Sequence, residues 1–288
     1  MGKARVIDGV ALANTIKNKA YNQSIRKHQE YGRYPGLAVI SVGEDPASQT
    51  YLRNKRKDCR DCNIHFEEYK FPSTISEKDL IDRVEAIGAF DNIDGLIVEL
   101  PLPEGINTDK VLSHIPLNKD IDCMNPRNIG KLYSSDEVQF KPCTPAGVLK
   151  ILKSENISIP GKDIVVVGRS DVVGKPLASM LTQYDATVTT CHSKTKDIGK
   201  YTRRADIVIS CVGKPNFITS DMIASGTIII DIGINYVDGK LCGDVAEDVW
   251  EVASAITPVP GGIGPMTRAM LMHNVVKSAE NRGYNYNK

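Results

Sequence analysis

Three residues in one short stretch of the sequence could carry out proton chemistry. Ser48, Tyr51 and Lys55 are spaced i, i+3 and i+7, so a helix would place all three on one face. A lysine beside a phenol in a cleft can act as a proton-transfer or positioning group. The same spacing also fits a solvated lysine beside a half-buried tyrosine, so other parts of the sequence must decide between the two.

Two carboxylates are further candidates for a site. Glu99 is the only charged residue in the apolar run 95–100, which Pro101 ends. A charge inside a buried strand is costly unless it is paired, so Glu99 should lie at the exposed end of the strand or in a site. Asp122 falls in a loop expected between two helices, where aspartate is also common without any function.

A second group of residues is typical of a nucleotide site. The apolar strand expected at 164–167 runs into Gly168-Arg169-Ser170, and Gly174 follows before a helix. Glycines in such a strand–loop–helix turn let the backbone approach a phosphate at the helix N-terminus. The spacing differs from G-x-G-x-x-G, so the context carries the prediction, and a purely structural turn is the alternative.

The end of the next strand indicates which dinucleotide would bind. NAD enzymes usually carry an acid at that strand tip, whereas here Ser193 and Lys194 follow the strand expected at 187–190. Together with Arg169, they could bind a 2′-phosphate, which predicts NADP rather than NAD; otherwise the cations are solvated surface groups. Further cofactor residues are expected just past the later strands, at Val212, Gly213, Gly233 and Ile234.

The elements that must position these residues follow from hydrophobic patterning. Strands are expected at 37–42, 65–70 and 95–100, and a helix at 10–30. A second helix should run over 47–62, capped by Asp45 before Pro46, and a third should begin at Ser76, whose spacing from Asp79 is that of a helix cap. From residue 163 onward, short apolar strands at 164–167, 187–190, 207–210 and 227–232 alternate with helical segments. Such alternation predicts a parallel sheet covered by helices on both faces.

We therefore predict an α/β protein of two α/β domains with a cleft between them. Residues 1–143 should form the substrate and catalytic domain, and residues 144–267 a Rossmann-like, doubly wound parallel sheet that binds the dinucleotide. The C-terminal helix, 268–288, should pack back on the first domain.

Composition excludes several other classes. The 288 residues carry 36 Lys+Arg and 35 Asp+Glu, a net charge of +1, so neither a nucleic acid nor an anionic membrane is an expected partner. Without an apolar run of about 18 residues or a signal peptide, the protein should be cytoplasmic, with its seven cysteines reduced. Cys59, Cys62 and His65 could supply three zinc ligands, but a second cysteine pair is missing, so we predict a buried helix face and no metal.

Six motifs, in order along nearly the whole chain, resemble the methylenetetrahydrofolate dehydrogenase/methenyltetrahydrofolate cyclohydrolase family. They are Ser48-x-x-Tyr51-x-x-x-Lys55, the segments 98–103 (VELPLP), 119–122 (KDID), 142–145 (PCTP) and 167–170 (VGRS), and the string 257–267 (TPVPGGIGPMT). The proline-glycine string and the Ser-Tyr-Lys helix are the most specific of these.

The resemblance implies two activities on tetrahydrofolate derivatives: oxidation of 5,10-methylenetetrahydrofolate by NADP, and hydrolysis of the resulting methenyl cation to 10-formyltetrahydrofolate. It implies that Lys55 is catalytic, that Tyr51 stacks on the folate ring and that Asp122 accepts hydrogen bonds from the pterin. It also implies a homodimer through the cofactor domain. The remaining residues implied for substrate binding are Ser48, Leu100, Pro101, Pro260, Gly261 and Gly262, and Thr267 joins the cofactor site.

The sequence departs from the family pattern at two positions, Glu99, where the family usually has Gln, and Cys123, where it usually has Gly. A carboxylate at 99 would pair with Lys55 and remove the free amine as a base, while stabilising the methenyl cation. We therefore hypothesise that the dehydrogenase is kept and that the cyclohydrolase is weakened or lost. Alternatively, a protonated Glu99 would behave like Gln.

Two other functions remain compatible with parts of the sequence. Another two-domain NADP dehydrogenase, of the shikimate or amino-acid type, could use Lys55 and an aspartate, but it leaves the string 257–267 unexplained. A non-enzymatic nucleotide-binding module would keep the Gly168 loop and leave the face of Ser48, Tyr51 and Lys55 unused.

Overall fold

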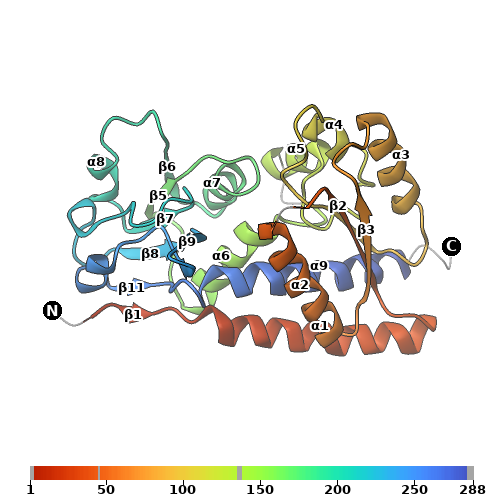
Figure 1. Cartoon of the computed structure of the whole chain (residues 1–288). Coiled ribbons are helices and arrows are strands. Elements are labelled where there is room, and N and C mark those ends of the chain that lie inside the picture. The colour runs from red at the N-terminus through yellow and green to blue at the C-terminus, as the bar shows by residue number, and fades with distance from the viewer. Residues whose placement is uncertain (1–2, 45, 135–137, 284–288) are drawn as a thin grey trace. The chain divides into compact units, whose positions relative to one another are not determined.

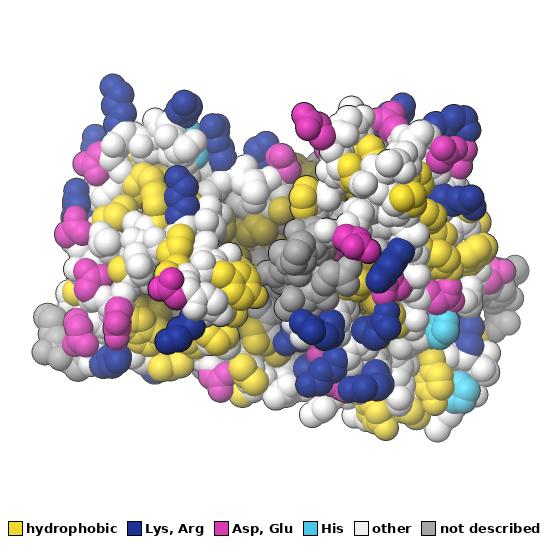
Figure 2. Space-filling view, viewed as in Figure 1, with side chains coloured by type: hydrophobic (Ala, Val, Ile, Leu, Met, Phe, Trp, Pro, Cys, Tyr) yellow, Lys and Arg dark blue, Asp and Glu magenta, His cyan; other side chains and the backbone are white. Residues whose placement is uncertain are grey.

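The chain folds into two compact units in a computed structural model that describes residues 3–44, 46–134 and 138–283. One unit, the six-stranded unit, comprises Met1–Ala13 and Pro142–Thr267, and the other, the three-stranded unit, comprises Asn14–Lys141 and Arg268–Lys288. Each unit is an α/β structure (Figure 1). In the face drawn in Figure 2, each unit carries both acidic and basic side chains, in keeping with the net charge of +1.

The three-stranded unit is built on a parallel sheet in the order β3-β2-β4. Its strands are β2 (Gly36–Val42), β3 (His65–Phe71) and β4 (Gly95–Val98), and its helices include α2 (Pro46–Asp61), α3 (Glu77–Gly88), α4 (Thr108–Leu112) and α5 (Pro126–Ser134). The central strand β2 is buried from its first residue to Ser41. Apolar side chains of α3, including Leu80 and Val84, pack with Ile40 of β2 in the core, which stabilises the unit through apolar burial.

Helix starts in this unit follow the capping chemistry expected from the sequence. The Ser76 hydroxyl accepts a hydrogen bond from the Asp79 amide at 3.1 Å, so the predicted cap of α3 is confirmed. Helix α2 begins at Pro46, where proline suits the first turn. Asp45, the predicted cap of α2, lies outside the described residues.

The six-stranded unit contains a wholly parallel sheet in the order β1-β11-β8-β7-β5-β6. The strands are β1 (Arg5–Val6), β5 (Asp163–Val167), β6 (Thr187–Cys191), β7 (Ile207–Ser210), β8 (Ile228–Asp231) and β11 (Ala255–Ile256). The helices α6 (Cys143–Ser154), α7 (Gly174–Gln183) and α8 (Gly199–Thr202) and the turns η1 (Ser220–Met222) and η2 (Glu247–Glu251) connect them, together with a hairpin of β9 (Asn235–Val237) and β10 (Lys240–Cys242).

The chain reverses its direction of growth across this sheet at β5. From β5 it passes to β6 on one side, and then returns to β7 on the other side of β5. In parallel α/β sheets, ligands bind outside the carboxyl ends of the strands at such a switch point. The predicted doubly wound sheet is confirmed, and it places the ligand position beside the ends of β5 and β7.

Two long helices take part in both units. Helices α1 (Gly9–Tyr31) and α9 (Ile263–Gly283) both begin in the six-stranded unit and end in the three-stranded unit. The N-terminal segment belongs to the six-stranded unit because β1 pairs with β11, whereas the sequence had suggested that it belongs to the first domain. Strands of two residues have too little periodic pattern to be predicted. No helix among the described ranges is both long and apolar enough to cross a membrane.

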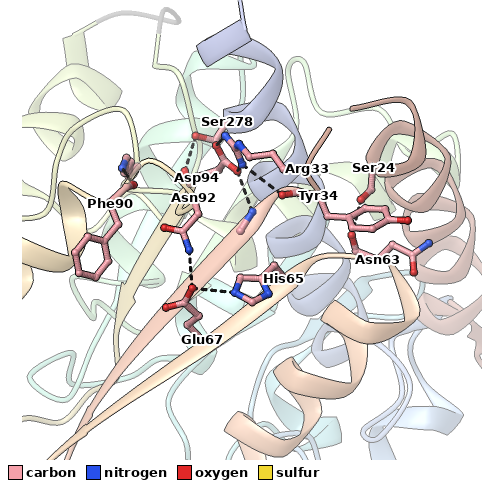
Figure 3. A network of polar contacts seen from close by, with 12 residues as sticks. Ser24, Arg33, Tyr34, Asn63, His65, Glu67, Phe90, Asn92, Asp94 and Ser278 are labelled. Carbon is pink, nitrogen blue, oxygen red and sulfur yellow. Dashed lines mark hydrogen bonds and ion pairs between the residues drawn. The ribbon is translucent and has the colours of Figure 1, made fainter. Parts of the chain in front are cut away.

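A buried carboxylate fixes the amino ends of the small sheet. Asp94, which is fully buried, accepts two hydrogen bonds from Arg33, at 2.7 and 2.9 Å, and one from the Gly36 amide at 2.9 Å. Its own carbonyl accepts from Ser278 of α9 at 2.6 Å (Figure 3). A bidentate arginine satisfies the buried charge. The network therefore joins the start of β2, the approach to β4 and α9 at the edge away from the strands' carboxyl ends.

Candidate active site

The central feature of the three-stranded unit is an ion pair between Lys55 of α2 and Glu99. The Lys55 ammonium donates a hydrogen bond to Glu99 Oε1. Glu99 directly follows strand β4, which ends at Val98. Its amide still donates to the Ile40 carbonyl of the neighbouring strand at 2.8 Å. Glu99 therefore lies at the carboxyl end of the strand, where a charge can be paired.

The environment of this pair is largely desolvated. The Lys55 side chain is 17% exposed and the Glu99 side chain 12%. Attraction between charges is stronger there than at a solvated surface, and removing one partner would leave the other poorly solvated. The pairing expected from the sequence is therefore present, and it couples α2 to the end of β4.

The orientation of α2 is set by Asp58 and Cys59, which lie one helical turn after Lys55. Asp58 is 2% exposed and forms ion pairs with Lys17 of α1 at 3.2 Å and with Arg268 of α9 at 3.1 Å. Cys59 is fully buried, and burial raises the pKa of its thiol. These contacts hold the helix on α1 and α9. Ser48 and Tyr51 lie on α2, and their side chains are outside the described part of the structure.

Cys59 of α2 and Cys62, which follows the end of this helix, behave as core residues. Cys62 is 1% exposed, and burial raises its pKa to about 12, so this thiol is not activated as a nucleophile or ligand. The ring of His65 contacts the Glu67 carboxylate at 2.8 Å. All seven cysteines are free.

The loop that carries Asp122 is ordered by its neighbour Asp120. Asp120 accepts hydrogen bonds from the Met124 and Asn125 amides at 2.8 and 3.0 Å and from the Asn128 side chain at 2.7 Å. Burial raises the pKa of Asp120. Asp122 itself is half-buried. Asp120, and not Asp122, therefore accepts the hydrogen bonds from Met124, Asn125 and Asn128 that order this loop.

Cys123 occupies a backbone conformation that suits glycine. Its φ is +54°, in the left-handed region where a Cβ is disfavoured. The side chain is 3% exposed. This conformation gives a physical reason why glycine is favourable at the position, and the cysteine must offset its strain by burial.

Leu100 and Pro101, which follow Glu99, are joined by a cis peptide bond. Leu100 is half-buried against the core of the small sheet, whereas Pro101 is exposed. A cis bond in the motif 98–103 could not be foreseen, since most X-Pro bonds are trans.

In the six-stranded unit, the predicted cofactor residues collect at the carboxyl edge of the sheet. Gly168 follows β5, with φ +128°, and its amide donates to the Cys191 carbonyl at the end of β6 at 2.9 Å. A Cβ at Gly168 would lie 2.5 Å from Cys211 Sγ, and one at Gly174 would lie 2.5 Å from the Gly168 carbonyl. Both glycines are therefore required by the close turn between β5 and α7.

This turn leaves its polar groups accessible. Ser170 Oγ accepts a hydrogen bond from the Gly174 amide at 3.3 Å, and Arg169 and Ser170 are exposed. Ser193 and Lys194 are also exposed, in the loop after β6. The exposed cations Arg169 and Lys194 carry the positive charge that suits the phosphates of a dinucleotide. The site fits NADP on these grounds.

The proline-glycine string forms a tight bend at the end of β11. The Gly9 amide donates to the Gly261 carbonyl at 3.0 Å, and the Gly262 amide donates to the Pro258 carbonyl at 2.7 Å. Pro260 follows a cis peptide bond. Thr267 of α9 shares a hydrogen bond of 2.9 Å with Thr144 of α6. The motif thereby ties the starts of α1, α6 and α9 together within the six-stranded unit.

The loops after β7 and β8 both lie against Asp244, a residue that the sequence patterns did not indicate. Val212 is half-buried, Gly213 and Ile234 are exposed, and Gly233 is buried. A Cβ at Gly233 would lie 2.2 Å from the carboxylate of Asp244, so this glycine makes room for a side chain of the protein itself. In the sequence, only the pair Gly243-Asp244 could have indicated the role of this aspartate, and such a pair is also common in ordinary turns.

The fold and the two sites define an α/β protein with a dinucleotide-type parallel sheet and a second α/β unit that carries a half-buried lysine–carboxylate pair. Residues 7–122 match the family described as tetrahydrofolate dehydrogenase/cyclohydrolase, catalytic domain, and residues 142–283 match its NAD(P)-binding domain. The chain belongs to the tetrahydrofolate dehydrogenase/cyclohydrolase family.

Similarity to individual relatives extends over almost the full length. A protein of Cupriavidus necator named Bifunctional protein FolD is 50% identical over 279 residues, covering 96% of this chain and 98% of the relative. The crystal structure of bifunctional FolD, methylenetetrahydrofolate dehydrogenase/cyclohydrolase, from Campylobacter jejuni has a TM-score of 0.94 at 44% identity, covering 97% and 99% of the two chains. A Trypanosoma brucei enzyme of the same type, complexed with NADP and an inhibitor, has a TM-score of 0.94 at 36% identity, covering 98% and 99%.

Proposed function

We propose that this protein oxidises 5,10-methylenetetrahydrofolate with NADP and acts on the resulting 5,10-methenyltetrahydrofolate by hydrolysis to 10-formyltetrahydrofolate. The observation that carries the proposal is the desolvated Lys55–Glu99 pair in a chain that matches both domains of the family. A shikimate- or amino-acid-type dehydrogenase and a non-enzymatic module are not favoured, because neither accounts for a match over the whole chain.

The residues of the three-stranded unit would bind and orient the folate. Asp122 would accept hydrogen bonds from the pterin edge, which is rich in donors, and Tyr51 would stack on its flat ring. Lys55 would be the catalytic lysine. The other proposed substrate contacts are Ser48, Leu100, Pro101, Pro260, Gly261 and Gly262.

The residues of the six-stranded unit would hold NADP, which supplies a hydride acceptor when bound. The turn from Gly168 to Gly174 would bind the pyrophosphate through backbone amides. Arg169, Ser193 and Lys194 would bind the 2′-phosphate by charge-assisted hydrogen bonds. Val212, Gly213, Gly233, Ile234 and Thr267 complete the proposed cofactor site.

Glu99 would shift the balance between the two activities. Loss of hydride from the one-carbon bridge leaves a cation, which a nearby carboxylate stabilises. The lysine in an ion pair is an ammonium group, which has no lone pair to accept a proton from water. We therefore propose that hydride transfer proceeds and that ring opening is slow relative to it.

A paired assay on one preparation tests both parts. NADPH formation from 5,10-methylenetetrahydrofolate would be followed by absorbance, and decay of methenyltetrahydrofolate would be compared with its spontaneous hydrolysis. We expect NADPH formation with little acceleration of the decay. Comparable acceleration of both steps would disprove the role of Glu99, and no NADPH would disprove the dehydrogenase itself.

We also propose that the protein is a cytoplasmic homodimer that associates through the six-stranded unit. The free cysteines support a reducing compartment. Exposed apolar side chains of the β9 strand, Tyr236 at 63% and Val237 at 43%, support a protein contact there. Light scattering of the wild type and a Tyr236→Glu variant tests the association, and a monomeric wild type would overturn it.

A further inference from the structure

The loop after β7 is shaped by a buried carboxylate from a distant part of the chain. The amides of Val212 and Gly213 donate to Asp244 Oδ2 at 2.8 and 3.3 Å, and the Lys214 amide donates to Asp244 Oδ1 at 2.8 Å. Gly213 has a φ of +66°. Successive amides that converge in this way form a small anion-binding concavity, and here the anion is part of the protein.

The acceptor capacity of Asp244 is fully used. Besides the three amides, its Oδ2 accepts from Ser210 Oγ at 2.9 Å and its Oδ1 from Asn235 Nδ2 at 3.0 Å. Asp244 is 0% exposed. An ionised carboxylate offers about four lone-pair positions, so the group has no remaining capacity to bind a ligand or move a proton, and its effect must act through the loop.

A second aspartate holds Asp244 in place. Asp231, at the end of β8, accepts hydrogen bonds from the amides of Asp244 and Val245, both at 3.0 Å, and from that of Gly233 at 2.9 Å. A Cβ at Gly243 would lie 1.9 Å from the Asp231 carboxylate. The backbone on both sides of Asp244 is therefore fixed, and the carboxylate cannot follow a shift of the loop.

The charge of Asp244 determines which part of a dinucleotide can lie against this loop. The amides of residues 212–214 already donate to Asp244, whose negative charge lies directly behind them. A phosphate is therefore disfavoured against this loop. Phosphates are better placed beside the exposed Arg169, in the turn between β5 and α7. Because β6 and β7 lie on opposite sides of β5, a dinucleotide whose 2′-phosphate is bound beyond β6 would extend its nicotinamide end over β7.

We propose that Asp244 is a positioning residue that shapes the backbone of residues 212–214 as the seat of the uncharged nicotinamide–ribose end of the cofactor. This inference rests on the proposed NADP-dependent function. In Asp244→Asn, one oxygen becomes an amino group that faces backbone N–H donors, so the loop must rearrange.

The test measures binding of NADP and of 2′-phospho-ADP-ribose, which lacks nicotinamide, by calorimetry. For Asp244→Asn we expect the NADP dissociation constant to rise about ten-fold or more, with that of 2′-phospho-ADP-ribose and the KM for the folate nearly unchanged. The control is Asp206→Asn. Asp206 also accepts a hydrogen bond from a backbone amide, that of Asp163 at 2.9 Å, but it lies at the amino ends of β5 and β7, away from the proposed cofactor site. The control should leave both dissociation constants unchanged.

Several outcomes would overturn the proposal: unchanged NADP affinity in folded Asp244→Asn, an equal loss for both ligands, or the same selective loss in the control. If that variant fails to fold, Ser210→Ala and Asn235→Ser weaken the support of Asp244 and keep its charge. They should raise the NADP constant about two- to five-fold and spare 2′-phospho-ADP-ribose; no change in NADP binding would also overturn it. A wild type that binds neither ligand would instead overturn the proposed function.

Discussion

Lys55 and Glu99 form an ion pair in which each side chain is less than one-fifth exposed to solvent. The pair joins the helix that follows β2 to the end of β4, the neighbouring strand of the sheet. A change at either residue should therefore alter both the charge presented to a substrate and the packing of α2.

Glu99→Gln should raise the cyclohydrolase activity relative to the dehydrogenase activity. A neutral amide cannot form the ion pair, so the Lys55 side chain is no longer held by a carboxylate and can take part in proton exchange with water. We expect the ratio of the two rates to change by about ten-fold or more. The paired assay measures this ratio, and the exposed residue Glu104 provides a control as Glu104→Gln. An unchanged ratio in Glu99→Gln would contradict the role of the pair.

Lys55→Met should slow methenyltetrahydrofolate hydrolysis by roughly 100-fold or more where proton transfer limits the ring opening. The variant also leaves Glu99 without its cation, which should lower the free energy of unfolding by a few kcal/mol. Lys57→Met on the exposed face of the same helix is the matched control. Activity of Lys55→Met close to that of the control would rule out a catalytic lysine at this position.

Arg169→Ala and Lys194→Ala should each raise the KM for NADP by about ten-fold while leaving any activity with NAD unchanged. Charge-assisted hydrogen bonds to a phosphate account for this selectivity, and the loss of each corresponds to about 1.4 kcal/mol. Initial-rate measurements with both cofactors test the prediction. Equal losses with NAD and NADP would show that the two cations do not recognise the 2′-phosphate.

Cys123→Gly should be more stable than Cys123→Ala. Both variants lose the buried sulfur, but only glycine relieves the backbone at φ +54°, which should be worth about 1 kcal/mol. Chemical denaturation of the two variants gives the difference directly. If alanine proved as stable as glycine, the conformation at residue 123 would not be strained.

The stability of the protein should depend on the ionisation of Asp231. Burial raises the pKa of Asp231 to about 6, above the usual value for an unfolded chain of about 3.9. The folded state therefore holds this proton more tightly, and the stabilising contribution, present at low pH, is lost as the pH rises toward and through about 6. We compare the free energies of unfolding of the wild type and Asp231→Asn. The wild-type value minus the variant value should decrease as the pH rises from 4.5 to 7, by at most about 3 kcal/mol. A pH-independent difference would exclude the shift.

Local sequence patterns were sufficient to predict most of the scaffold. Apolar runs predicted β2, β5 and β7, and the Ser76 cap predicted the start of α3, because each depends on residues close together in the chain. The apolar run alone predicted that Glu99 lies at the exposed end of the strand or in a site; its pairing with Lys55 was expected only from the family resemblance.

Features that depend on distant residues could not be predicted in this way. Asp244 contacts amides 30 to 32 residues earlier in the chain, and its motif has no local signature. Gly233 was predicted only as a residue just past a strand at the cofactor edge of the sheet, and that pattern gave no sign that the carboxylate of Asp244 lies beside it. The strands β1 and β11 have two residues each, so they carry no alternation that could be recognised.

The pairing of β1 with β11 has a consequence for folding during synthesis. Arg5 and Val6 leave the ribosome well before their partners Ala255 and Ile256, which lie 250 positions later in the chain (255 − 5). At about 5–20 residues per second, the N-terminal strand waits many seconds for its place in the sheet. The other strands, β5 to β8, can assemble earlier, so the edge formed by β11 and β1 should be the last part of the sheet to close.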